Sequence, residues 1–417
     1  MSPAVAVWGI AAAATGAVIV RPWRIPEPVW AVAGAAALVL SGLLPVGAAW
    51  RGVAAGTDVY LFLTGMMLLA EVARQQGLFD WLAAHAAALA RGSARRLFTL
   101  VYVVGTAVTV FMSNDATAVV LTPAVAAVTR AVKAEQPLPY LLVCAFIANA
   151  ASFVLPISNP ANLVIYGSRM PPLPQWLSTY AFPSLLSIVA TYVALRLTQR
   201  RALLQPVAVQ VAMPALTRAG RAAAAGIVAT AVALMAVSAL DWQLGLPTCL
   251  AGLATLVPVA LLGRSSLWSV LRNVSWGVLP LVAGLFVMVE AVDGTGIIGM
   301  LAEALRSSME RSPDGAAWGS GVLVGLACNV MNNLPAGLIV AHAVQAAPGT
   351  PQLTAAALIG IDLGPNLTVT GSLATLLWLA ALRREGLQVG AALFFRLGLV
   401  VMPPALVLAL AALLYIG

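Results

Sequence analysis

Long apolar stretches separated by short polar or basic loops fill most of the 417-residue chain. At least ten of them approach the length of about 20 residues that a helix needs to cross the hydrocarbon core. Examples are Ala4–Val20, Val29–Val46, Tyr60–Ala73, Ala222–Leu240 and Val389–Tyr415. Hydrophobic residues make up 61% of the chain and charged residues 9%, against about 25% charged in soluble domains. The pattern predicts an all-α polytopic membrane protein.

Two of these stretches are followed by a polar run, Met112–Thr117 and Met331–Pro335. Polar side chains and broken backbone are costly in hydrocarbon unless they line a cavity or bind something. Interruptions at matching places in two halves of a chain are the best sequence indicator of a transporter's binding site. We therefore expect the two runs to contribute to one site.

The two halves of the chain resemble each other. Gly65–Glu71, followed by Gly77, matches Gly284–Glu290, followed by Gly296, at an offset of 219 residues. The offset shrinks slowly along the chain, as small deletions after a duplication would cause. We predict two inverted-topology repeats, each with five spans, one of them broken, and a re-entrant helical hairpin.

The predicted boundaries follow from this plan. The first repeat covers residues 1–197, with a hairpin at 97–132 on the cytoplasmic side and a broken span at 138–168 whose break is Ile157–Asn162. A cytoplasmic linker covers 198–218. The second repeat covers 219–417, with a periplasmic-side hairpin at 316–346 and a broken span at 353–382. Twelve ordinary spans are the alternative that hydropathy alone would give.

Loop charges orient this topology. With both termini outside, seventeen of the 22 Lys and Arg residues fall in inner loops and four in outer loops, while Arg396 lies within the last span. Cytoplasmic loops carry such an excess of Lys and Arg. The net charge of +8 is therefore explained without a nucleic-acid partner. We expect a multi-pass protein of a bacterial or archaeal cell (inner) membrane.

Four breaks converge in the predicted fold, namely the two hairpin tips and the unwound parts of the two broken spans. Each exposes unpaired backbone N–H and C=O groups near the middle of the bilayer. Asparagine amides and hydroxyl groups at the breaks add donors and acceptors that suit a small hydroxyl-rich or oxyanionic solute. Asparagines also join helices in membranes, which explains one or two of them but not the whole set. The predicted substrate-binding residues are Ser113, Asn114, Thr117, Ser158, Asn159, Asn162, Asn332, Asn333, Asn366, Thr370 and Ser372.

Two carboxylic acids, Asp115 and Asp362, lie within these elements. An acid in a cavity of low dielectric constant holds its proton to a higher pH than in water, so both are candidate proton carriers. The structural alternatives are that Asp115 caps a helix N-terminus and that Asp362 makes a static hydrogen bond or ion pair.

Other chemistry finds no support in the sequence. The three cysteines, Cys144, Cys249 and Cys328, have no metal-ligand or disulfide spacing. No segment resembles a nucleotide-binding loop, and no acid or histidine cluster indicates a membrane enzyme. We predict no catalytic residue, resident metal or cofactor, and a transporter driven by an ion gradient or by a separate subunit.

The chain resembles the ArsB family of arsenite and antimonite efflux permeases in the ion transporter superfamily. The motifs that carry the resemblance are Phe111–Pro123, Ile157–Val164, Asn332–Leu338 and Asp362–Thr375. Dicarboxylate carriers of the superfamily have Ser-Asn-Thr at both tips. This chain instead has Ser113-Asn114-Asp115 and Asn332-Asn333-Leu334, which argues against a sodium–dicarboxylate site.

The resemblance implies export of arsenite and antimonite, exchanged for protons, by elevator-like movement of the hairpins and broken spans. It also implies a homodimer and, in two-component pumps, a soluble ATPase subunit. Sodium–proton exchange and organic-anion transport within the same superfamily are the alternative functions.

Overall fold

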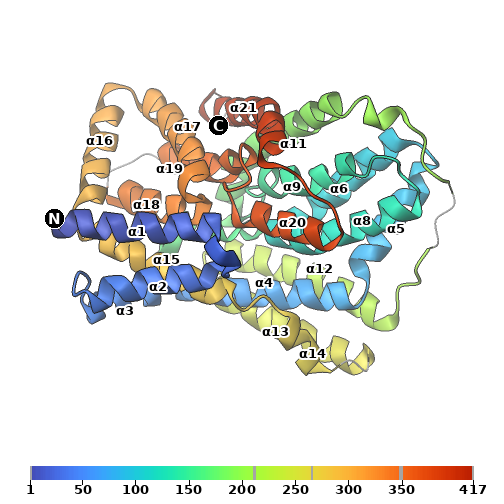
Figure 1. Cartoon of the computed structure of the whole chain (residues 1–417), viewed down its shortest axis with the longest axis horizontal. Coiled ribbons are helices and arrows are strands. Elements are labelled where there is room, and N and C mark those ends of the chain that lie inside the picture. The colour runs from blue at the N-terminus through green and yellow to red at the C-terminus, as the bar shows by residue number, and fades with distance from the viewer. Residues whose placement is uncertain (1, 210–212, 264–265, 347–350, 416–417) are drawn as a thin grey trace.

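The computed structural model describes residues 2–209, 213–263, 266–346 and 351–415 (Figure 1). All regular elements in these ranges are helices. Six helices are long and apolar enough to cross a membrane, or eight spans if each of two bent pairs counts as one, within the part of the chain that the structure describes. The chain is therefore a multi-pass helical membrane protein.

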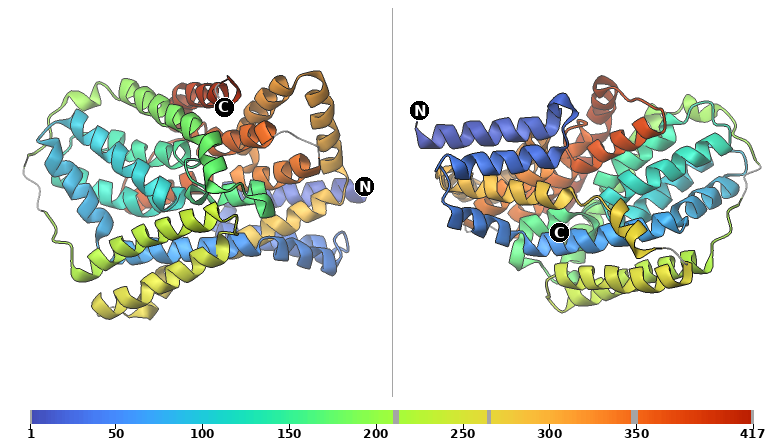
Figure 2. Two further views of the ribbon diagram at one scale, coloured as in Figure 1. Left: turned by 180° about the vertical axis from the view of Figure 1, so that it is seen from behind. Right: turned by 60° about the horizontal axis from the view of Figure 1, so that its bottom comes forward.

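One group of helices lies along the lower side of the molecule in Figure 1. In this group α2 packs against α1, α3 and α15, and α13 packs against α4 and α12. Figure 2 shows α4 beside α12 and α13 from two further directions. The members are α1 (Pro3–Val20), η1 (Pro22–Arg24), α2 (Glu27–Leu40), α3 (Val46–Ala55), α4 (Thr57–Gln75), α12 (Arg218–Ala239), α13 (Gly245–Gly263), α14 (Leu267–Asn273) and α15 (Val278–Asp293).

The predicted span Val29–Val46 is shorter than expected. Helix α2 ends at Leu40, and Gly42 then takes a left-handed φ of 74°. Pro45 precedes α3, which meets α4 at a bend of 46°. Glycine adopts positive φ without steric cost, and a residue before proline avoids the helical region, so both residues favour this interruption.

The remaining helices of the first half form a second group. They are α5 (Leu78–Ala90), α6 (Ala94–Phe111), α7 (Asn114–Ala116), η2 (Thr117–Leu121), α8 (Thr122–Ala131), α9 (Leu138–Ala150), η3 (Pro156–Ser158), α10 (Pro160–Tyr166), η4 (Gly167–Arg169), α11 (Leu173–Thr198) and η5 (Ala202–Leu204). Helix α5 packs against α6 and α8, and α6 packs against α9.

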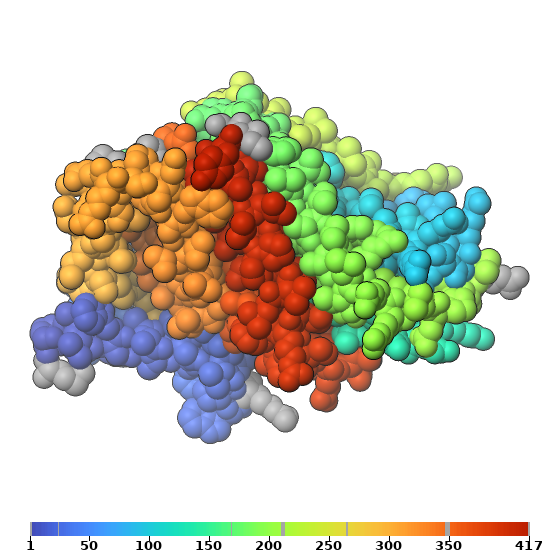
Figure 3. Space-filling model, turned by 90° about the horizontal axis from the view of Figure 1, so that it is seen from above, coloured from blue at the N-terminus to red at the C-terminus, as the bar shows by residue number. Residues whose placement is uncertain are grey.

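The second half repeats this order of elements. Its helices are α16 (Ile297–Arg311), α17 (Pro313–Met331), α18 (Asn333–Ala346), α19 (Pro351–Leu363), η6 (Gly364–Asn366), α20 (Leu373–Arg384) and α21 (Ala391–Tyr415). A left-handed glycine precedes both α5 and α16, Gly77 with φ 69° and Gly296 with φ 83°. Figure 3 shows α21 in red across one face of the molecule, where it packs against α11.

Helix α9 ends earlier than the predicted break at Ile157. It stops at Ala150, and regular α-helix resumes only at Pro160. Side chains take over the exposed carbonyl groups here, because the Asn162 amide donates to the carbonyls of Ser152, Leu155 and Pro156 at 2.9–3.3 Å. Pro156 also lacks an N–H to continue the helix. The unwound segment is therefore 151–159.

The predicted re-entrant hairpins correspond to α6 through α8 and to α17 through α18. Helix α6 is by itself long and apolar enough to cross a membrane, and α17 has 19 residues. The arms are longer than the sequence indicated. Re-entry and the inverted orientation of the halves stay predictions.

Candidate functional site

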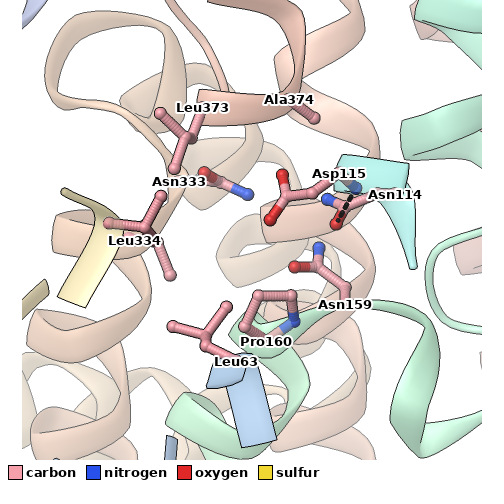
Figure 4. Close-up of a pocket in the computed structure, with 10 residues that line it drawn as sticks. Leu63, Asn114, Asp115, Asn159, Pro160, Asn333, Leu334, Leu373 and Ala374 are labelled. Carbon is pink, nitrogen blue, oxygen red and sulfur yellow. Dashed lines mark hydrogen bonds between the residues drawn. The ribbon is translucent and has the colours of Figure 1, made fainter. Parts of the chain in front are cut away.

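A small pocket lies where the four helix breaks meet (Figure 4). Asn114 and Asp115 come from the first tip, and Asn333 from the second. Asn159 comes from the first broken span and Leu373 from the second. The cavity measures about 10 Å³, which is room for about one water molecule. Residues far apart in the chain thus meet at one point.

Four helices begin at this pocket. Ser113 caps α7, Asn159 caps α10 and Ser372 caps α20, each by accepting a backbone N–H with its side-chain oxygen. The fourth helix, α18, begins at Asn333. Helix N-termini carry partial positive charge and free N–H groups, so they favour oxygen-bearing or anionic ligands. The longer helices α18 and α20 contribute most of this partial positive charge.

Asp115 is the only carboxylate among the described residues that line this pocket. Its side chain is half-buried and has no hydrogen-bond partner in the described part of the chain, although its backbone N–H donates to Asn114 Oδ1 at 2.9 Å. Figure 4 shows Asp115 and Asn333 pointing toward each other, with Asn159 beside them. Asn333 Oδ1 is buried without a partner among the described residues. Both tips therefore direct polar side chains to the same point.

A larger cavity of about 620 Å³ adjoins the pocket. We call this larger cavity the vestibule. Leu63, Asp115 and Pro160 line both spaces. The lining of the vestibule also includes Arg74 and Arg384. A helix rises about 1.5 Å per residue, so Arg74 stands roughly 16 Å along α4 from Leu63. The vestibule thus extends from the tips to the side where the loop charges predict the cytoplasm.

Asp362 lies behind the pocket and is fully buried at the end of α19. Asn159 Nδ2 donates to its Oδ1 at 2.5 Å, whereas Oδ2 has no hydrogen-bond partner among the described residues. Asn159 therefore contacts the pocket and also this second acid. One amide side chain thus bonds to Asp362 and lines the same pocket as Asp115.

The other predicted site residues in the first half hold the breaks instead of lining the small pocket. Ser113 lines the vestibule, and Thr117 bonds to Thr109 at 2.8 Å. Ser158 donates to the Val110 carbonyl at 2.9 Å, and Asn162 donates to the three carbonyls described above. These contacts fix the first tip and the first unwound segment.

In the second half, the predicted residues bind the tip to its own broken span. Asn332 Nδ2 donates to the Thr370 carbonyl at 3.1 Å, and the Asn333 N–H donates to the Gly371 carbonyl at 2.9 Å. Asn366 forms two hydrogen bonds with α9. Its Oδ1 accepts from the Asn149 side chain, and its Nδ2 donates to the Phe146 carbonyl. The Thr370 hydroxyl donates to the carbonyl of Asn329 at 3.1 Å.

Sequence reasoning missed two asparagines that organise these breaks. Asn149 donates to Asn366 Oδ1 at 3.0 Å, across the two broken spans. Asn329 donates to the Gly325 and Gly364 carbonyls and accepts from Thr368. Each stands in a mostly apolar stretch close to a helix break, and that position is the signal that could have identified them.

A multi-pass helical protein with two broken helices around a central polar pocket is a membrane transporter by class, and the comparisons with known proteins agree. The family model described as citrate transporter, CitMHS, matches residues 15–361. The chain therefore belongs to the CitMHS family, within the ion transporter superfamily.

Arsenical pump membrane proteins are among its relatives. The protein of that name from Yersinia enterocolitica is 29% identical over 406 residues, covering 92% of each chain. One from Escherichia coli is 29% identical over 404 residues, again covering 92% of each. The resemblance predicted from the four motifs is thereby confirmed.

Solved structures show the same fold at lower identity. The YdaH transporter of Alcanivorax borkumensis has a TM-score of 0.59 and 16% identity, covering 88% of this chain and 86% of its own. MtrF of Neisseria gonorrhoeae has a TM-score of 0.52 and 14% identity, covering 87% of this chain and 82% of its own.

Proposed function

We propose that this protein is a secondary active transporter that exports arsenite and antimonite in exchange for protons. The observation that carries the proposal is the position of Asp115. Its carboxylate has no protein partner among the described residues, faces the second tip, and borders both the small pocket and the vestibule. The names of the arsenical pump relatives supply the substrate class.

The small pocket holds about one water molecule, so a neutral trivalent hydroxide would bind at its junction with the vestibule, where the polar groups suit such a solute. Arsenous acid is uncharged near neutral pH and presents three hydroxyl groups. The Asp115 carboxylate can accept from a hydroxyl, while the Asn159 and Asn333 side chains and the helix N-termini can donate to the oxygens. No cysteine lines the pocket among the described residues, so release does not require breaking arsenic–sulfur bonds.

Proton exchange follows if Asp115 binds either a proton or the substrate. With the vestibule open to the cytoplasm, the deprotonated carboxylate binds the solute. On the outer side the solute leaves and a proton binds to Asp115. The protonated carrier returns and releases that proton to the cytoplasm, which restores the carboxylate. The elevator-like form of the movement, with hairpins and broken spans shifting against α1–α4 and α12–α15, is part of the proposal.

Asp362 is the second proton carrier in this account. It hydrogen-bonds to Asn159, so a change in the ionisation of Asp362 alters a side chain that lines the pocket. A homodimer and a soluble ATPase subunit, both implied by the family resemblance, complete the proposed assembly in the inner membrane.

Transport of sodium and protons, or of an organic anion, is the second candidate. Two observations favour an anion: the family description as citrate transporter and the four helix N-termini at the pocket. Against it, the small pocket includes no Lys or Arg among its described lining residues, and an acid occupies its centre. A multiply charged carboxylate would meet Asp115 without compensation.

Inverted membrane vesicles separate these functions. We expect arsenite uptake when the interior is acidified, loss of uptake with an uncoupler, no dependence on sodium, and no competition by citrate. ATP in vesicles that contain only this chain should add nothing beyond the proton gradient. Sodium-dependent or citrate-inhibited uptake would favour the second candidate, and full proton-driven uptake by an Asp115→Asn variant would contradict the coupling role.

A further inference from the structure

Two adjoining cavities lie between the N-terminal end of α6 and the C-terminal end of α11, and they share no lining residue with the transport pocket. Their volumes are about 480 and 210 Å³. Arg95 and Arg196 line both, so the two spaces form one crevice. Hydrogen bonds join its walls, because Thr99 on α6 bonds to the Tyr192 hydroxyl on α11 at 2.7 Å. Side chains of α6 and α11 therefore hold the two walls of the crevice together.

Five arginines line this crevice, and none has an ion-pair partner among the described residues. They are Arg91, Arg95, Arg96, Arg196 and Arg200. By contrast, Arg74 pairs with Glu71 and Arg130 pairs with Glu385, although the loop charges place them on the same side. The positive-inside tendency explains the sign of these charges but not their convergence without acids on one crevice.

The side chain of Arg196 is held in place within the crevice. Its guanidinium donates to the Tyr192 hydroxyl and to Thr99 Oγ1, and its Cζ lies 5.6 Å from the centre of the Tyr192 ring. An arginine ordered in this way has free N–H groups with fixed directions, which suits bidentate binding of a phosphate. The N-terminus of α6, capped by Ser93, adds partial positive charge beside it.

The walls of the crevice are apolar and exposed. Leu89 is 61% exposed and Leu197 is 60% exposed, and both line it together with Val193 at 45%. On a membrane protein such side chains face lipid tails. The arginines suit an anionic head group, and the exposed apolar wall suits the hydrocarbon chains of the same amphiphile. An acidic soluble protein would match the charges but would leave the wall uncovered.

We propose that this crevice binds an anionic phospholipid of the cytoplasmic leaflet. The phosphate lies among Arg95, Arg96 and Arg196, and the acyl chains follow Leu89, Val193 and Leu197. Basic pockets between membrane helices on the cytoplasmic side bind lipid head groups in this way. The site does not depend on which solute the central pocket carries.

Binding of phosphatidylglycerol to the purified full chain tests this proposal. Native mass spectrometry of protein in neutral detergent, titrated with phosphatidylglycerol or with phosphatidylcholine of the same acyl chains, reports the bound lipid. We expect retention of phosphatidylglycerol alone. The variant Arg95→Gln/Arg196→Gln should bind it about thirtyfold more weakly, because each arginine near a lipid surface contributes about fivefold.

The matched control is Arg218→Gln/Arg221→Gln, which removes the same charge from exposed positions at the start of α12 and should bind like wild type. If Arg95→Gln/Arg196→Gln does not fold, Arg95→Gln/Arg200→Gln, both exposed, replaces it. Equal binding by crevice and control variants would overturn the proposal. So would displacement of the lipid by millimolar glycerol phosphate, which would show a free-phosphate site, or equal binding of both lipids.

Discussion

The two hairpin tips face each other across the pocket, but they are held differently. The second tip is bonded directly to its own broken span, through Asn332 to the Thr370 carbonyl and through the Asn333 backbone to the Gly371 carbonyl. Among the described residues, the polar side chains of the first tip bond within their own hairpin, through Ser113 and Thr117, and the first broken span reaches that hairpin through Ser158, which donates to the Val110 carbonyl. The less constrained tip carries the acid, Asp115. The difference indicates that the second tip is the fixed wall and the first tip the titrating group.

The largest expected effect is on transport. Asp115→Asn should reduce proton-driven arsenite uptake into inverted vesicles to the level of uncoupled membranes, because the amide cannot exchange a proton. The matched variant is Asn333→Asp in the same background. It should not restore uptake, since that tip is fixed to its broken span. Restored uptake in the double variant would mean that an acid at either tip can couple transport to protons.

The buried contact between the two halves comes next. Asn159→Ala removes the hydrogen bond that Asp362 Oδ1 accepts. Both oxygens of a fully buried carboxyl group are then without a hydrogen-bond partner among the described residues. We expect a loss of about 3 kcal/mol in stability, seen as a lower unfolding midpoint in detergent. In an Asp362→Asn background the same change should cost less, because the two residues form one contact. If the stability losses of the two single variants add up to that of the double variant, the contact is not energetically important.

Helix packing behind the second break should also be sensitive. A Cβ at Gly364 would meet the Gly325 carbonyl oxygen at 2.2 Å, so Gly364→Ala must push α17 away from η6, which follows α19. The expected cost is about 2 kcal/mol. Gly319→Ala, on the same helix as Gly325, meets nothing within 4 Å and serves as the control. Equal unfolding midpoints for both variants would contradict this packing.

The smallest effect should come from the first tip. Ser113→Ala removes the side-chain acceptor for the Ala116 N–H, 3.2 Å away, and should cost about 1 kcal/mol. Ser113→Thr keeps a hydroxyl and should unfold like wild type. A cost larger than that of Gly364→Ala would reverse the proposed contrast between a fixed second tip and a looser first tip.

Much of this architecture could be predicted from polar residues in apolar stretches. The runs around Asp115, Asn159 and Asn333 identified the residues that line the pocket, because polar groups in hydrocarbon must have a partner or a cavity. The ends of α2 at Leu40 and of α9 at Ala150 could not be predicted as well, because hydropathy continues across both interruptions.

Other features depend on contacts that sequence spacing does not contain. Asn162, Asn332 and Thr370 are polar residues at breaks, like Asn159, yet the structure uses them to bond carbonyl groups. Which asparagine faces the pocket depends on the side of the helix end from which it projects. The vestibule likewise arises from α4, α5, α14 and α20 meeting in space.

Proton release on substrate binding tests the central claim most directly. Purified protein in weakly buffered detergent solution, near the pH at which half of the transport activity remains, is mixed with arsenite while a pH indicator is followed. Wild type should release protons in proportion to bound arsenite, and Asp115→Asn should release none. Equal release by both proteins, or arsenite binding without any release in wild type, would contradict exchange of substrate and proton at Asp115.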